Sequence, residues 1–172
     1  MNSIFRQVLR FILVILLQLI ICNKVHLFGF ITPALFIYAL LLLPVELPKS
    51  LQYFIGFLCG FIVDMFTHTL GINAAASVII MTLRPSVIRT LNGHKSSETT
   101  ENPIPGFKDF SWLLSYAILM SLIHQTMVVM LEVSSFHSFL HTLLAILGNT
   151  TLTGFLILCI EYIVFPTKRS NY

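Results

Sequence analysis

Charged residues are scarce in this chain, and their scarcity excludes a water-soluble fold. Asp, Glu, Lys and Arg make up 10% of the 172 residues, whereas hydrophobic residues make up 56%. A soluble domain carries about 25% charged residues, so this chain has too few to cover a surface that faces water. Its long apolar runs are typical of membrane-spanning helices. The composition therefore predicts an all-α integral membrane protein, with one domain over residues 1–172 and membrane lipid as its first partner.

Motifs for catalysis, nucleotide binding and metal binding are also missing. The chain has no G-x-S-x-G, no Walker loop and no cluster of carboxylates, so we expect no catalytic residue and no enzymatic activity. Its three cysteines form no C-x-x-C pair and no metal-type spacing. His137 and His141 have the i, i+4 spacing of a metal site, but no third ligand is obvious beyond Glu132. We expect no metal and no cofactor.

Six apolar segments approach the length of about 20 residues that a membrane-spanning helix needs. They are residues 8–22, 27–43, 51–67, 72–85, 110–131 and 139–165. The first resembles a signal peptide, but no small-residue cleavage site follows it, so we interpret it as an uncleaved span. The second has Pro33 in its first turns, where a missing N–H is tolerated. The fourth is short, and a polar, turn-rich loop over residues 84–109 follows it.

Lys and Arg are distributed unevenly over the predicted loops. With six spans and a cytoplasmic N-terminus, nine of the ten lie on the cytoplasmic side and only Lys24 lies outside. This strong positive-inside bias favours an even number of spans, with both termini in the cytoplasm. Because these basic residues follow the topology, they do not indicate a nucleic-acid partner.

An ionisable residue inside a span is costly, so Asp64, toward the outer end of the third span, needs an explanation. It lies four residues before His68, on the same helix face, and Gly71 then precedes the fourth span. Asp64 can pair with His68, or it can accept hydrogen bonds from the N-terminus of the fourth helix. Both a ligand or partner site and a structural bond that fixes the turn between two helices fit this pattern.

Two further pairs of residues stand out around Asp64. Gly56 and Gly60 are one turn apart in the third span, a G-x-x-x-G pattern that allows two helices to approach closely. Arg84 and Pro85 close the fourth span. Arg84 fits either a cytoplasmic anchor that snorkels to the headgroups or a polar anchor for the following loop or a partner.

Polar side chains also lie inside the last two spans. Glu161 is near the cytoplasmic end of the sixth span, where it fits an acid at the membrane interface or a partner of Lys168 or a nearby Arg. Five polar residues lie in mid-span, and we expect them to form hydrogen bonds between helices: His124, Gln125, Asn149, Thr150 and Thr151.

The stretch from Gly56 to Pro85 carries an ordered set of features. A Gly-rich third span is followed by an Asp, a short spacer that ends in Gly, a small-residue fourth span and a closing Arg-Pro. The positions are Gly56, Gly60, Asp64, Gly71, Ala74, Ala76, Arg84 and Pro85. This set resembles the rod shape-determining protein MreD family in its Bacteroidetes-type form. The resemblance covers most of the first ninety residues, whereas the last two spans agree in length and polarity only.

The resemblance implies a non-enzymatic component of the cell-elongation machinery in the bacterial inner membrane. MreD-like proteins associate with the single-span periplasmic protein MreC. Together they couple the MreB filament to a SEDS glycosyltransferase and a class B penicillin-binding protein, which make peptidoglycan. The implied fold is similar to the substrate-binding subunits of energy-coupling-factor transporters, with six helices around a cavity open to the outside. On that fold Asp64 and His68 would lie near the rim of the cavity.

Two other functions stay open on the sequence. The first is a vitamin-binding subunit of a membrane transporter, which fold similarity alone does not exclude. Its ligand pocket would draw on the polar candidates Asp64, His68, Asn73, Gln125 and Asn149. The second is a lipid-modifying enzyme, which needs paired acid and base residues at one membrane depth. Asp64 and Glu161 lie toward opposite faces in the predicted topology, which disfavours such an enzyme.

Overall fold

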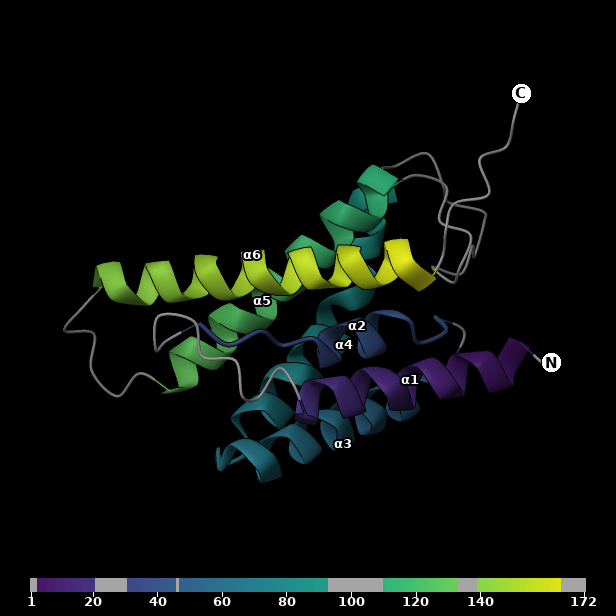
Figure 1. Cartoon of the computed structure of the whole chain (residues 1–172), viewed down its shortest axis with the longest axis horizontal. Helices are drawn as coiled ribbons and strands as arrows, with labels where there is room; N and C mark the ends of the chain where they lie inside the picture. Colours follow the sequence, from purple (N-terminus) through teal and green to yellow (C-terminus); the bar gives the residue numbers. More distant parts are fainter. Residues whose placement is uncertain (1–2, 21–30, 46, 93–109, 133–138, 165–172) are drawn as a thin grey trace.

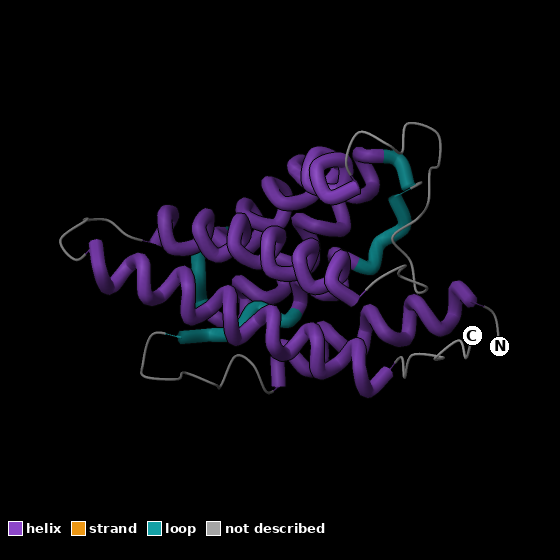
Figure 2. Tube along the Cα trace, turned by 90° about the horizontal axis from the view of Figure 1, so that it is seen from above, coloured by secondary structure: helices purple, strands orange, loops and turns teal. Residues whose placement is uncertain are grey.

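The computed structural model describes residues 3–20, 31–45, 47–92, 110–132 and 139–164 of the chain. The helices over these residues are α1 (Ser3–Ile20), α2 (Phe36–Leu41), α3 (Lys49–Thr67), α4 (Ile72–Asn92), α5 (Phe110–Glu132) and α6 (Phe139–Val164). Figure 2 shows helices and loops, with no strand, over the described ranges. The prediction of an all-α protein is confirmed for this part of the chain.

Four of the helices are long and apolar enough to cross a membrane. Their qualifying segments are Lys49–Thr67, Ile72–Asn92, Ser111–Glu132 and Leu140–Glu161. A shorter apolar segment, Leu9–Ile20, lies in α1. Many large hydrophobic side chains on these helices are exposed, which would be unfavourable in water and suits contact with lipid tails. The chain therefore has the architecture of a multi-pass membrane protein.

Most of the predicted spans coincide with helices. The predicted limits 51–67, 110–131 and 139–165 agree with α3, α5 and α6 to within two residues. The first predicted span, residues 8–22, overlaps α1, of which the described part ends at Ile20.

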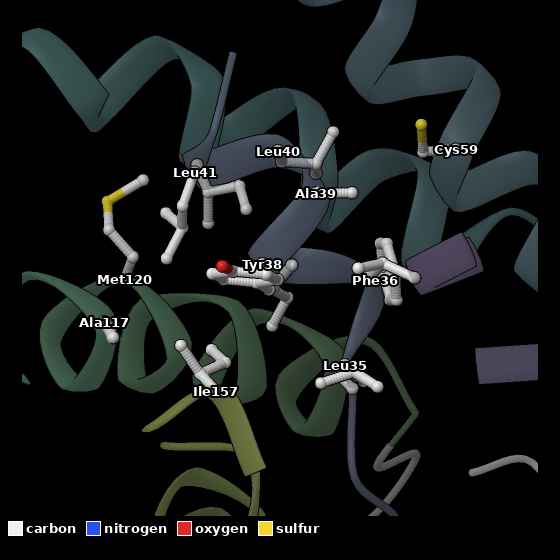
Figure 3. Packing of buried hydrophobic residues seen from close by; sticks show 14 of the residues in the cluster. Leu35, Phe36, Tyr38, Ala39, Leu40, Leu41, Cys59, Ala117, Met120 and Ile157 are labelled. Carbon is white, nitrogen blue, oxygen red and sulfur yellow. The ribbon is translucent and has the colours of Figure 1, made fainter. Parts of the chain in front are cut away.

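α2 lies in the middle of the molecule, between α6 on one side and α1 and α3 on the other (Figure 1). All six of its residues are buried, as expected for a helix that is hydrophobic on every face. Figure 3 shows Met120 of α5 and Ile157 of α6 beside Tyr38 of α2, with Cys59 of α3 on the opposite side. The hydrophobic core is therefore built around this short helix.

The structure corrects the prediction of a helix over residues 27–43. Within the described part, only Phe36–Leu41 is helical, and residues 31–35 are not. Residues 27–30 lie outside the described ranges. Pro33 has no N–H and disfavours helical geometry in the residue before it, so the helix starts after the proline. Non-helical backbone is tolerated at membrane depth where it is buried in protein and hydrogen-bonded.

The fourth helix also differs from its prediction. α4 does not end at Arg84 and Pro85 but continues to Asn92, with Pro85 inside the helix. The buried Val87 belongs to this additional length, so packing against the core offsets the hydrogen bond that the proline removes. The predicted loop over residues 84–109 is therefore helical in its first part, and its remainder lies outside the described residues.

Candidate functional site

Asp64, near the end of α3, caps the start of α4. Asp64 is 2% exposed, and its carboxylate accepts the backbone N–H groups of Asn73 at 3.0 Å and Ala74 at 2.9 Å. The side chains of Asn73 and Thr69 donate to the same carboxylate. The first N–H groups of a helix lack partners within it and carry partial positive charge, so a carboxylate satisfies them. Asp64 therefore bonds the N-terminus of the fourth helix, one of the two arrangements that the sequence allowed.

His68 contributes to this turn through its backbone. It ends α3 in the left-handed conformation, with φ 57°, and its backbone N–H donates to the carbonyl of Asp64. No bond joins the His68 side chain to Asp64 in the described part of the chain, so the alternative pair is not formed. Gly71 has φ 82°, a conformation that glycine adopts without strain. These two residues reverse the chain between α3 and α4.

Gly56 and Gly60 lie where α3 meets α4. A Cβ on Gly60 would lie 2.4 Å from the carbonyl oxygen of Asn73 and 2.6 Å from the Cα of Ala74. At Gly56 the nearest atom would be Cγ of Met81, at 2.9 Å, which belongs to a flexible side chain. The G-x-x-x-G pattern therefore serves a close contact inside the chain.

Arg84 of α4 is only 1% exposed. Its guanidinium donates to the hydroxyl of Tyr116 in α5 at 2.9 Å and to Oε1 of Gln52 in α3 at 3.4 Å. It also donates to the backbone carbonyls of Leu41, at 3.1 Å, and Leu43. The interpretation of Arg84 as a snorkelling anchor is therefore wrong. Carbonyls at the end of a helix carry partial negative charge, which compensates the buried cation here.

The non-helical residues before α2 are held in part by α1. The side-chain amide of Gln18 donates to the carbonyl of Pro33 and accepts the N–H of Phe36, both at 3.2 Å. Gln18 is 3% exposed, and a buried amide of this kind satisfies backbone groups that the short helix leaves open. One glutamine thus fixes the point where α2 begins.

α6 holds the same segment from the other side. Asn149 accepts the N–H of Thr32 at 2.7 Å, and the hydroxyl of Thr153 accepts the N–H of Ala34 at 3.0 Å. Asn149 was expected to bond between helices, and it bonds the non-helical Thr32 instead, whereas Thr153 was not predicted. The available signal was their spacing, because residues four apart lie on one helix face.

Polar residues of the last two helices follow their predictions only in part. Glu161 accepts a hydrogen bond from the hydroxyl of Tyr38 and lies within electrostatic range of Arg10, whereas the other possible partner, Lys168, lies outside the described residues. Both ring nitrogens of His124 are buried without a hydrogen-bond partner, and its ring packs edge-on against Phe36 at 5.3 Å. Among the described residues, the interhelical bonds expected of His124, Gln125 and Thr150 are therefore absent, and the hydroxyl of Thr151 donates to the carbonyl of Leu147 in its own helix.

A cavity of about 210 Å³ lies at the end of the bundle where α3 turns into α4. Polar side chains from α1, the segment before α2, the α3–α4 turn and α5 contribute to its wall. They are Gln18, Thr32, Thr67, Thr69, Asn73, Gln125 and Glu132. Asp64 bonds two of these residues, Thr69 and Asn73, but does not itself line the cavity.

No protein family, curated protein or solved structure matches this chain. The site is therefore interpreted from its own contacts, which form two groups. Asp64 ties α3 to α4 at one end of the bundle, and Arg84 ties α4 to α2, α3 and α5 further along it. Both groups hold helices in place.

The residues predicted for a ligand pocket or a metal site are only partly brought together in the structure. Of the five residues proposed for a vitamin pocket, Asn73 and Gln125 line the cavity, whereas Asp64, His68 and Asn149 do not. Within the described ranges, no three His, Cys, Asp or Glu residues come together as a metal site. His137, part of the pair considered for a metal, lies outside those ranges.

Proposed function

We propose that this chain is a non-enzymatic scaffold of the bacterial inner membrane, which maintains cell shape and supports peptidoglycan synthesis by binding an MreC-like single-span protein. This is the function that the resemblance to the MreD family implies. The elongation complex around it would contain an MreB filament, a SEDS glycosyltransferase and a class B penicillin-binding protein.

The proposal rests on one observation: the residues that carry the resemblance hold helices together in the structure. Gly60 admits the backbone of α4, Asp64 caps that helix, and Gly71 makes the turn between α3 and α4. Arg84 then ties α4 to the end of α2. A pattern whose members hold helices together suits a protein that acts through its shape and contacts. This supports a scaffold over an enzyme.

The proposal includes six membrane crossings and a cytoplasmic N-terminus. α1, the segment over residues 31–43 and α3 to α6 would each cross once. Arg84 is buried and no longer counts as a loop charge, but eight of the ten Lys and Arg residues still lie on the cytoplasmic side. The cavity then opens to the outside, in an arrangement similar to the substrate-binding subunits of energy-coupling-factor transporters.

A pull-down with crosslinking from native membrane tests the scaffold function. The tagged chain is expected to bring down a single-span protein with a coiled coil, and its depletion is expected to make rod-shaped cells round. If no such partner is recovered and depleted cells stay rod-shaped, the proposal is wrong.

The cavity favours a second candidate, a small-molecule (vitamin) binding subunit of a transporter. Such a subunit purified in detergent would retain a tightly bound molecule at one copy per chain. Mass spectrometry of the extracted protein distinguishes the two functions, because a scaffold retains no stoichiometric vitamin.

A further inference from the structure

The cavity beside the α3–α4 turn contains a buried amide without a partner. Gln125 of α5 is 3% exposed and lines the cavity, yet it forms no hydrogen bond with a described residue. A buried amide without a partner costs about 1–3 kcal/mol, so water or a ligand must satisfy it. This residue makes the cavity a candidate binding site.

Charge on the cavity wall is of one sign. Among the described residues that line the cavity, Glu132 is the only charged one, and no Lys or Arg is among them. The carboxylate of Asp64 lies behind the wall, within electrostatic range of Glu132. An anionic group such as phosphate or a carboxylate would be repelled here, whereas a cation would be attracted.

Size restricts the occupant further. Pockets for drug-sized ligands usually enclose about 300–1,000 Å³, and this cavity encloses about 210 Å³. It fits a group of a few heavy atoms better than a whole vitamin. Gln125 and Glu132 are seven residues apart, which separates them by about 10 Å along the helix axis. Since Gln125 is buried and Glu132 is exposed at the end of α5, the amide lies deep and the carboxylate lies at the mouth.

We infer that this cavity binds a small primary ammonium group at the Glu132 carboxylate, at its mouth, whereas the Gln125 amide, in its interior, bonds a polar group at the other end of a free ligand. Two sources can supply this chemistry. One is a free small amine, and the other is the ethanolamine headgroup of a phospholipid, whose phosphate stays outside the cavity. The inference does not depend on the scaffold function.

Three two-carbon probes test the free amine. Ethanolamine, ethylene glycol and glycolate differ mainly in carrying a positive, a neutral or a negative group, so they separate charge from size. Calorimetric titration of the full chain in nanodiscs of phosphatidylcholine is expected to detect ethanolamine in preference to both others. Glu132→Gln and Gln125→Leu should each weaken its binding by about tenfold, as expected for the loss of one hydrogen bond to a charged ligand.

Two control variants keep this test interpretable. Thr126→Val alters a neighbouring residue of α5 whose hydroxyl bonds its own helix, at Leu122, and should leave binding unchanged. Glu132→Asp keeps the charge and should retain more affinity than Glu132→Gln. A thermal melt of each variant separates loss of binding from loss of folding.

A second arm tests the lipid source. Nanodiscs that contain phosphatidylethanolamine are examined by native mass spectrometry, which counts retained lipids. Retention by the wild type that falls in Glu132→Gln assigns the site to the headgroup, whereas ethanolamine binding alone assigns it to a free amine. If ethanolamine binds no better than ethylene glycol and lipid retention is the same in both proteins, the inference is wrong. Failure of this test would leave the pull-down result unaffected.

Discussion

At the scale of single residues, a buried guanidinium is stable only when its N–H groups find acceptors. Arg84 finds four of them, from a hydroxyl, an amide and two backbone carbonyls. None of these acceptors is a carboxylate, so its charge is balanced by dipoles. This makes Arg84 a cation that depends on the planar, forked geometry of its donors.

Arg84→Lys is therefore expected to be destabilising although it keeps the charge. An ammonium group cannot reach the same spread of acceptors, and the groups it leaves unpaired are buried. We expect a loss of about 3–5 kcal/mol, the usual cost of breaking a buried charge interaction. Reversible unfolding in mixed detergent micelles measures it. Arg89→Lys on the exposed side of α4 is the matched control, with a change within about 0.5 kcal/mol. Equal losses in the two variants would contradict this account of Arg84.

The difference between Asp64 and Arg84 shows what the sequence can reveal about single residues. The bonds of Asp64 are local, since Thr69, Asn73 and Ala74 follow within ten residues, and the start of a helix after Gly71 could be expected. The acceptors of Arg84 lie 32 to 43 residues away in sequence. No local pattern indicates partners at such a separation.

At the scale of helices, α3 and α4 approach so closely that a Cβ on Gly60 would clash with backbone, whereas a Cβ on Gly56 would clash with a side chain and lie in ordinary contact with backbone. The Cβ of an alanine at position 60 would meet backbone atoms of α4, which cannot move aside without shifting the helix. At position 56 it would meet Cγ of Met81, in a side chain that can change its conformation. The two glycines of one motif are therefore not equivalent.

Gly60→Ala is expected to lower the free energy of unfolding by about 2–3 kcal/mol, the upper range for overpacking a core. Gly56→Ala is its matched control. There, a small clash is offset by the 0.5–1 kcal/mol or so that a helix gains when glycine is replaced. Unfolding midpoints of the two variants in one detergent mixture measure the difference. Equal midpoints would mean that α3 and α4 do not pack as described.

α2 is the element that the sequence could not predict. The apolar run over residues 27–43 has the length and composition of a span, so a continuous helix was the natural prediction. The backbone N–H groups of Thr32, Ala34 and Phe36 are instead satisfied by side chains up to 119 residues away. Hydrophobic periodicity reports which residues are buried, and here it was right about burial. It does not report whether side chains or helical bonds satisfy the backbone.

At the scale of the whole molecule, orientation decides what the cavity can meet. The cavity lies at the end where α3 turns into α4, so the side of the membrane that this turn faces is the side to which the cavity opens. The positive-inside bias predicts that this side is the outside. The same placement is required if the partner is a periplasmic protein.

Two exposed residues at opposite ends of α3 test this orientation. Leu70, in the α3–α4 turn, is 99% exposed, and Ser50, in the first turn of α3, is also exposed. In a background without the three native cysteines, Leu70→Cys is expected to react with a membrane-impermeant maleimide in intact spheroplasts. Ser50→Cys is expected to react only after lysis, because α3 carries it to the cytoplasmic side. Reaction of both from one side would mean that α3 does not cross the membrane. The reversed result would turn the cavity toward the cytoplasm and remove a periplasmic partner from its reach.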